Sequence, residues 1–142
     1  ADIRAILELG AAGVQMATRF VATDECDASP VFKESYISAT EEDLEIIASP
    51  VGMPGRALHN QFLADVAEGK KAPYSCPYHC IVTCDPKKAP YCISLALLNA
   101  QRGKMDKGFA FAGTNAVRVK KVVPVKELVD TLEQEYRSSG KV

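Results

Sequence analysis

The sequence predicts an α/β fold that is rich in helices and holds only a few short strands. Three stretches lead to this prediction. Residues 2–10 carry apolar side chains at helical spacing, and residues 14–20 follow as a short, apolar, partly β-branched run typical of a strand. Residues 125–136 repeat apolar side chains at the i, i+3, i+4, i+7 spacing of an amphipathic helix. With 142 residues, 47% of them hydrophobic, the chain can form one domain with its own core, spanning 1–142.

Charge and composition exclude several classes of partner. The formal net charge of -1 indicates neither a nucleic acid nor an anionic membrane surface. No apolar run approaches the roughly 20 residues of a membrane-spanning helix, and the first residues lack a signal-peptide pattern. The five cysteines are an odd number. We therefore expect a reducing, cytoplasmic location, with thiols that are reduced or metal-bound rather than paired in disulfides.

The first predicted elements are a helix and the strand that follows it. Asp2 can cap the helix, and Gly10 ends it. The strand over residues 14–20 ends in small residues and a hydroxyl, which would leave backbone N–H groups directed past its C-terminal end. In α/β folds such an end binds phosphate. The alternative is a strand that contributes only to the core.

A second helix is predicted to begin at Ser29-Pro30, with Ser29 as its N-cap and Pro30 at its first position. Its inward side chains would include Val31, Phe32 and Tyr36. Residues 43–49 follow as a short strand or, alternatively, as the end of a helix.

Glycine and proline predict a loop over residues 50–56, and apolar spacing predicts a helix over residues 57–68. Arg56 lies where the two meet. Its guanidinium either reaches a phosphate or carboxylate group or remains solvated or locally paired.

Four cysteines lie close together in a Cys-rich insert over residues 70–92. They are Cys76, Cys80, Cys84 and Cys92, in the pattern C-x3-C-x3-C-x7-C. If a helix forms, the spacing of four places the first three along one stripe. Four thiolates can hold zinc or an iron–sulfur cluster, although this pattern matches no standard motif. The alternative is a set of reduced, packed thiols, and His79 is a weaker candidate ligand.

The last third of the chain predicts two helices with a tight segment between them. Residues 91–101 are apolar on nearly all sides, which indicates a helix buried on more than one face. Residues 108–116 alternate Phe and Ala beside glycine, which indicates backbone packed closely against a neighbour. The last helix begins near Pro124, and its predicted inward residues are Val125, Leu128, Val129, Leu132 and Tyr136.

The stretch GAAGVQMATRF after a helix resembles the last barrel strand of the nitronate monooxygenase (2-nitropropane dioxygenase) family. That family is related to the flavin-dependent enoyl-ACP reductases, and its members are FMN-binding (β/α)8 barrels in which this strand holds the FMN phosphate. The resemblance implies cofactor contacts from Gln15, Met16, Ala17 and Thr18, with Ala17 where the family usually has glycine.

A second segment, residues 111–114, is similar to the family's AGQ segment near the flavin and its substrate. This similarity implies contacts from Gly113 and from Thr114, which stands where the family commonly has glutamine.

A complete barrel of this kind takes about 250 residues. The resemblance therefore makes the chain the C-terminal portion of a (β/α)8 TIM barrel, helix-rich and not a complete barrel. In the family the catalytic histidine lies upstream of these segments, so we expect no catalytic residue here and no activity from the chain alone. We expect its partner to be the N-terminal half, or a second copy in a homo-oligomer, because exposed strand edges otherwise pair or aggregate.

The sequence leaves three functions open. The first is a segment of an FMN-dependent oxidoreductase that oxidises alkyl nitronates, which are small-molecule substrates, with O2. The second is an NAD(P)H-dependent flavin enzyme similar to the enoyl-ACP reductases. The third, from a different class, is a non-catalytic metal-binding or interaction module built on the four clustered cysteines.

Overall fold

A computed structural model describes residues 2–71 and 75–140. Within them the helices are α1 (Asp2–Glu8), α2 (Thr18–Val21), α3 (Pro30–Ile37), α4 (Gln61–Ala67), α5 (Ile93–Gln101) and α6 (Val125–Ser138), and the strands are β1 (Leu44–Ala48) and β2 (Pro54–Leu58). Short 3₁₀ turns cover Glu41–Asp43, Met105–Lys107 and Thr114–Arg118. The described residues are thus rich in helices and poor in strands, as predicted.

The two strands form an antiparallel pair in which Leu44 faces Leu58. The backbone after α5 extends this pair along the free edge of β2. The N–H of Leu58 donates to the carbonyl oxygen of Ala110, and the N–H of Ala112 donates to the carbonyl oxygen of Arg56, both at 3.0 Å. The alternating Phe–Ala segment is therefore packed closely against a neighbour, as predicted, and that neighbour is β2.

The strand predicted over residues 43–49 is confirmed as β1. The predicted loop over residues 50–56 and helix over residues 57–68 are wrong in their bounds, because β2 begins within the first and ends within the second. Pairing with β1 holds this backbone extended. Helix α4 begins only after Asn60, whose Oδ1 accepts the N–H of Leu63 at 3.0 Å and caps the helix there.

The strand predicted over residues 14–20 is not formed. Residues 11–17 have an irregular backbone, and α2 begins at Thr18. A strand needs a neighbouring strand to receive its hydrogen bonds, and no strand of the described residues lies beside this segment. The β-propensity of these side chains therefore did not produce a strand, because the described residues provide no neighbouring strand to pair with it.

Helix α3 begins as predicted, with Oγ of Ser29 accepting the N–H of Phe32 at 3.2 Å. Tyr36 is buried, and its hydroxyl donates to the carbonyl oxygen of Phe111 at 2.6 Å. Val31, predicted to face inward, is instead 56% exposed. It stands five positions before Tyr36, so the two side chains point to different sides of the helix.

Helix α5 confirms the predicted apolar helix, but the expected burial on more than one face is wrong. Its buried residues Ile93, Ala96 and Ala100 lie along one face, and Leu95 is 41% exposed. The backbone at Gly108 approaches α5 so closely that a Cβ there would lie 1.9 Å from the carbonyl oxygen of Ala96. Only a residue without a side chain fits this approach. Gly108 therefore fixes how the segment before the Phe–Ala run crosses the helix.

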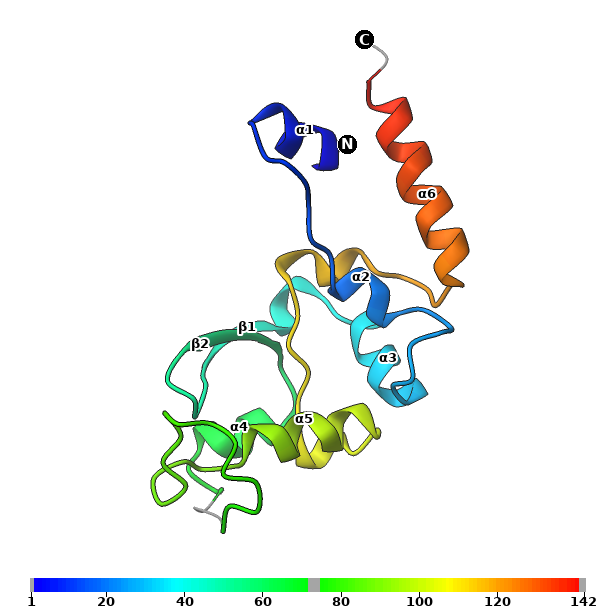
Figure 1. The fold of residues 1–142 in the computed structure, drawn as a ribbon. Coiled ribbons are helices and arrows are strands. Elements are labelled where there is room, and N and C mark those ends of the chain that lie inside the picture. Colours follow the sequence, from blue (N-terminus) through cyan, green and yellow to red (C-terminus); the bar gives the residue numbers. More distant parts are fainter. Residues whose placement is uncertain (1, 72–74, 141–142) are drawn as a thin grey trace.

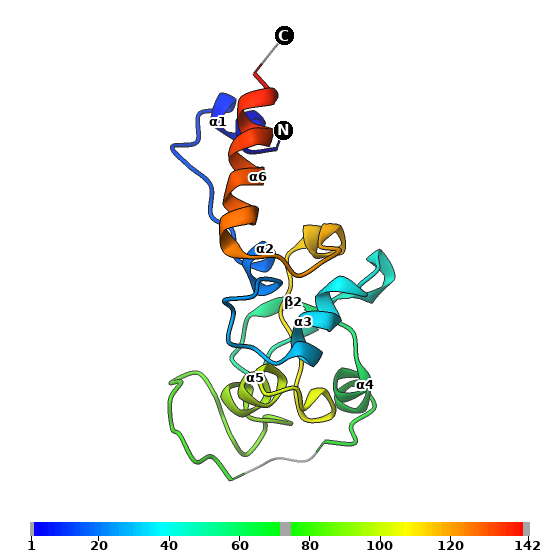
Figure 2. The same ribbon diagram turned by 90° about the vertical axis from the view of Figure 1, so that its right-hand side faces the viewer.

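Helix α6 also confirms its prediction, but it is less buried than expected. Leu128 is 2% exposed, whereas Val129 and Tyr136 are 41% and 36% exposed. Helix α6 extends away from the body of the molecule alongside α1 (Figures 1 and 2). The Arg4 guanidinium lies 4.5 Å from the centre of the Tyr136 ring and donates to the Tyr136 carbonyl oxygen at 3.2 Å, which ties α1 to α6.

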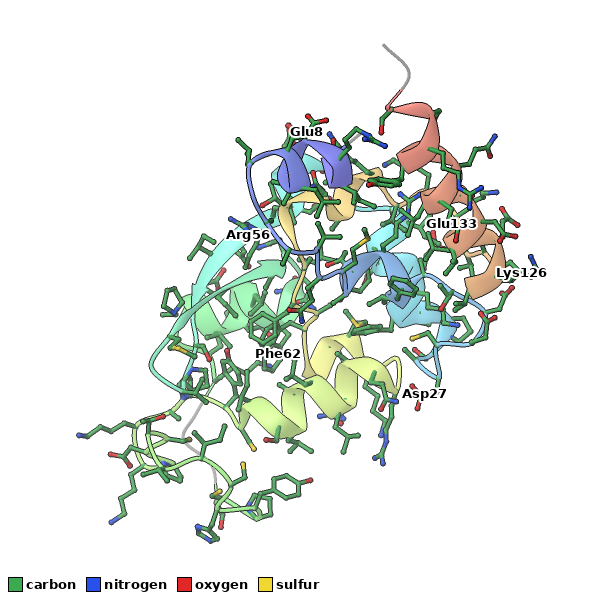
Figure 3. The ribbon with its side chains drawn as sticks, turned by 45° about the horizontal axis from the view of Figure 1, so that its top comes forward. Glu8, Asp27, Arg56, Phe62, Lys126 and Glu133 are labelled. Carbon is green, nitrogen blue, oxygen red and sulfur yellow. The ribbon has the colours of Figure 1, made fainter. Side chains whose placement is uncertain are left out.

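The core consists of two clusters on either side of the Phe–Ala segment. In the first, the ring of Phe62 lies 5.1 Å from that of Tyr91, which lies 5.8 Å from that of Phe109. The second gathers Tyr36 and Leu58 with four alanines, Ala39, Ala110, Ala112 and Ala116. Figure 3 shows Phe62 in the interior, whereas the charged side chains labelled on α6 point outward.

The molecule has two distinct ends. Helices α1 and α6 lie at one end, and the connection between α4 and α5, which carries the clustered cysteines, lies at the other (Figures 1 and 2). Among the described helices, none has the length and apolar composition needed to cross a membrane.

Candidate functional site

A cavity of about 900 Å³ lies between α1, the irregular segment after it, the 3₁₀ turn Thr114–Arg118 and the end of α6. Its lining includes every residue for which the resemblance implied a cofactor contact. These are Gln15, Met16, Ala17, Thr18, Gly113 and Thr114. Two segments predicted to share one ligand are thus brought to one cavity.

The two segments are joined by a direct hydrogen bond. The backbone N–H of Gly113 donates to Oγ1 of Thr18 at 3.0 Å, across 95 residues of sequence. A Cβ added at Gly113 would lie 3.3 Å from the same oxygen, so the backbone approaches the hydroxyl closely. A hydroxyl that accepts one hydrogen bond still has its own proton to donate. Thr18 therefore keeps a donor for a ligand in the cavity.

Backbone donors are available beside Thr18. In the described part of the chain, the N–H groups of Gln15, Met16 and Ala17 have no hydrogen-bond partner. Ala17 is exposed and Met16 is half-buried, so water or a ligand satisfies these groups. Unpaired N–H groups in series are the usual protein partners of phosphate oxygens.

Charged side chains of both signs stand at the cavity. Arg19 and Arg118 line it together with Asp2 and Glu135. Nη1 of Arg118 lies 2.7 Å from Oδ2 of Asp2, but both side chains are well exposed, so this ion pair contributes little to stability. Arg118 was not recognised from the sequence. It belongs to the basic run over residues 118–121, and that run was the signal that could have pointed to it.

The rest of the lining suits a flavin. Ile3, Ile6, Val14 and Leu132 give the cavity an apolar wall, and its volume lies within the range of small-molecule sites. An apolar wall suits a planar ring, and the unpaired donors with two arginines suit a phosphate group. The residues present therefore fit FMN. Arg56 does not belong to this site, since its exposed side chain extends from β2 outside the lining.

The four clustered cysteines line a separate, smaller hollow of about 160 Å³, together with His79. The helix that would have aligned three of them is not formed. His79 has a φ of 47°, the left-handed conformation that interrupts a right-handed helix. As the described residues stand, no three or more His, Cys, Asp or Glu side chains are grouped to hold a metal ion. The expected metal site is therefore not present in this conformation.

Comparison with known proteins shows to which family the chain belongs. A sequence model of the nitronate monooxygenase family matches residues 1–135. The chain is 33% identical to the nitronate monooxygenase of Pseudomonas aeruginosa over 135 residues, covering 95% of the chain and 36% of that protein. A probable nitronate monooxygenase of Staphylococcus saprophyticus is 36% identical over 64 residues, covering 45% of the chain and 18% of that protein.

Among solved structures, FabK from Thermotoga maritima superposes with a TM-score of 0.75 at 28% identity, covering 95% of the chain and 40% of FabK. FabK is a TIM-barrel enzyme, so the chain has the fold of a portion of that barrel, and the described residues form no closed barrel. The chain spans 36% of the P. aeruginosa relative and 40% of FabK. It belongs to the nitronate monooxygenase family.

Proposed function

We propose that the chain provides the phosphate-binding part of an FMN-dependent oxidoreductase that oxidises alkyl nitronates with O2. The observation that carries the proposal is the hydrogen bond from Gly113 to Thr18, which joins two cofactor segments at the wall of one cavity. Membership of the nitronate monooxygenase family supports the reaction class. Bound FMN would supply the chemistry, taking electrons from the nitronate and passing them to oxygen.

The residues of the chain would act by binding and orienting. The free N–H groups of residues 15–17 would donate to phosphate oxygens, and the hydroxyl proton of Thr18 would add one more donor. Arg19 and Arg118 would balance the negative charge from the cavity wall. For Arg118 this requires exchanging its exposed contact with Asp2 for the phosphate, which costs little.

Gly113 and Thr114 would form one wall of the substrate pocket. Both are exposed at the cavity. Neither histidine of the chain, His59 or His79, lines this cavity. A histidine base for removing a substrate proton would therefore not come from the described lining of this cavity, and the chain alone is expected to bind FMN without turning over substrate.

A second candidate is an NAD(P)H-dependent flavin enzyme similar to the enoyl-ACP reductases. It is kept because two of the solved structures that resemble the chain are forms of FabK. The two functions differ in their electron donor. Consumption of O2 with a nitronate and without NAD(P)H, measured on a preparation that contains the catalytic histidine, favours the first. Oxidation of NAD(P)H with an enoyl thioester favours the second.

The binding claim is tested by titrating the purified chain with FMN and with riboflavin, which lacks the phosphate, and following flavin fluorescence. Charge-assisted hydrogen bonds contribute about 1.5–3 kcal/mol each, so FMN should bind at least about tenfold more tightly than riboflavin. Equal affinities for FMN and riboflavin would contradict the proposal that the cavity binds the phosphate group. If neither FMN nor riboflavin bound saturably, the cavity would not be a flavin site within this chain.

A further inference from the structure

Two side chains of the basic run over residues 118–121 have no role in the proposed function, Lys120 and Lys121. Together with Arg19 and Arg118 they line a second hollow, of about 270 Å³, between α2 and α6. We propose that this hollow binds a phosphate group, in addition to the phosphate that FMN would place in the larger cavity. Phosphate binding there goes beyond the proposed function and does not require FMN.

The floor of the hollow is part of the folded core. Ala22, Val119 and Leu128 line it and are all buried. The N–H of Val123 donates to the carbonyl oxygen of Ala22 at 3.3 Å, and the N–H of Asp24 donates to the carbonyl oxygen of Val123 at 3.1 Å. These bonds hold the end of α2 against the segment that leads into α6, and the two lie side by side in Figures 1 and 2. The fold therefore sets the shape of the hollow.

The hollow carries an excess of positive charge. In its described lining, four cationic side chains stand with a single carboxylate, that of Glu127, whose Oε1 lies 2.8 Å from Nζ of Lys121. Arg118 contacts Asp2 from outside the lining, but both side chains are well exposed, so another anion can replace this contact at little cost. A concave surface lined mainly by one sign of charge raises the local concentration of the opposite ion. The hollow therefore attracts anions.

Two of the four cationic side chains lack a partner. In the described part of the chain, the side chains of Arg19 and Lys120 make neither a hydrogen bond nor an ion pair. Lys120 is exposed and stays hydrated, whereas Arg19 is half-buried. Burial removes water from a guanidinium group, which is unfavourable unless another group accepts its hydrogen bonds. A phosphate in the hollow would supply those acceptors.

Size and charge together select a phosphate group. Sites for whole small molecules usually measure about 300–1,000 Å³, so a hollow of about 270 Å³ suits a single group better than a complete nucleotide. A phosphate monoester carries a charge of about -1.5 to -2 at neutral pH and presents several acceptor oxygens. Two arginines and two lysines around one hollow match such a group better than they match a carboxylate with one charge.

The hollow adjoins the larger cavity, because Arg19 and Arg118 line both. A guanidinium group has several N–H donors in a fixed fork, so one arginine can donate to phosphates on two sides. Two phosphates that share these arginines can belong to one ligand, as in the pyrophosphate of FAD. They can also belong to two ligands, FMN and a phosphate ion. The chemistry that the hollow recognises is the same in both cases.

The test is the binding of inorganic phosphate to the purified chain, alone and with saturating FMN, followed by amide NMR. Lys120→Gln removes an unpaired cation and should weaken phosphate binding by about threefold to fivefold. Glu127→Gln removes the carboxylate and releases Lys121, so it should strengthen binding, a gain that a damaged fold would not give. The matched control is Lys126→Gln, at an exposed side chain outside the hollow that points outward in Figure 3, and it should change the affinity much less.

Titration with FAD and FMN identifies the source of the phosphate. Tighter binding of FAD, with the gain lost in Lys120→Gln, assigns the hollow to the second phosphate of the dinucleotide. Equal affinities, with inorganic phosphate bound beside FMN, assign it to a phosphate ion. If FMN does not bind, only the proposed function fails, because the effect of Lys120→Gln on inorganic phosphate still tests the hollow. Phosphate affinity that is unchanged in Lys120→Gln and Glu127→Gln, or that falls equally in Lys126→Gln, would overturn the proposal.

Discussion

The backbone N–H of Gly113 donates a hydrogen bond of 3.0 Å to the hydroxyl oxygen of Thr18, across 95 residues of sequence. This contact brings the segment after α1 and the segment after the Phe–Ala run to the same cavity wall. It also fixes the hydroxyl so that its proton remains available. The proposed FMN phosphate site depends on this arrangement more than on any other single contact.

Replacing Thr18 with valine removes the hydroxyl and keeps the shape of the side chain. The phosphate would lose one donor, and the N–H of Gly113 would lose its acceptor. Loss of one charge-assisted hydrogen bond should weaken FMN binding by about tenfold or more. Riboflavin binding should change much less, and Thr18→Ser, which keeps the hydroxyl, should retain FMN affinity. A Thr18→Val variant that binds FMN as tightly as the unmodified chain would contradict the role given to this side chain.

Ala17→Gly should strengthen FMN binding. Ala17 is exposed, lines the cavity and has a φ of -122°, so its methyl group occupies space at the wall without straining the backbone. Without that methyl group a phosphate can approach the backbone more closely. Isothermal titration should show a lower Kd for FMN and an unchanged one for riboflavin. The matched control is Ala12→Gly, an exposed position outside the lining, and an equal gain there would refute the explanation.

Gly108→Ala should strongly destabilise the fold. The new Cβ would lie 1.9 Å from the carbonyl oxygen of Ala96, so α5 and the Phe–Ala segment must separate. Overpacking of this kind typically lowers the free energy of unfolding by about 1–3 kcal/mol, and a clash with the backbone should place the loss at the upper end of that range. Urea unfolding of the variant and of the unmodified chain measures this loss. Gly13→Ala, where an added Cβ meets nothing within 4 Å, should leave the unfolding midpoint almost unchanged.

Stability should fall at high pH because of two buried tyrosines. Burial, with a smaller contribution from the charge of Cys26, raises the pKa of Tyr36 to about 12, and burial alone raises that of Tyr91 to about 12. The folded state thus favours neutral phenols. This stabilisation is fully present below the ordinary tyrosine pKa of about 10 and is lost as pH rises through about 12.

The variant Tyr36→Phe separates this effect from general alkaline denaturation. The free energy of unfolding should fall less steeply between about pH 10 and 12 in the variant. At neutral pH the variant should be less stable by about 1 kcal/mol, because the 2.6 Å bond to the Phe111 carbonyl is lost. Tyr78→Phe, at a side chain that is 47% exposed, should leave the slope unchanged. Equal slopes in all three proteins would contradict the assignment to Tyr36.

The sequence predicted those elements whose signals are local. The Ser29-Pro30 start defined α3, and apolar spacing defined α5 and α6. The elements it missed depend on distant partners. Pairing with β1 makes a strand of the Pro–Gly stretch at the start of β2, and the segment over residues 14–20 has no strand beside it among the described residues.

The candidate site was predictable only in part, and for a similar reason. Family resemblance pointed to the two segments that are proposed to contact the cofactor, and the fold places them at one cavity. It did not point to Arg118, because its position at the cavity follows from how the turn Thr114–Arg118 packs against α2. The helix expected at the clustered cysteines does not form, because His79 adopts the left-handed backbone conformation. The spacing of the cysteines does not predict this conformation.

The most direct test of the central claim is an amide NMR titration of the ¹⁵N-labelled chain with FMN and, separately, with riboflavin. The account predicts that FMN shifts the N–H signals of Gln15 to Thr18 and of Gly113, that riboflavin shifts these signals much less, and that signals of residues 75–91 stay in place. Shifts confined to other parts of the chain, or none at saturating FMN, would contradict the assignment of this cavity as the phosphate site.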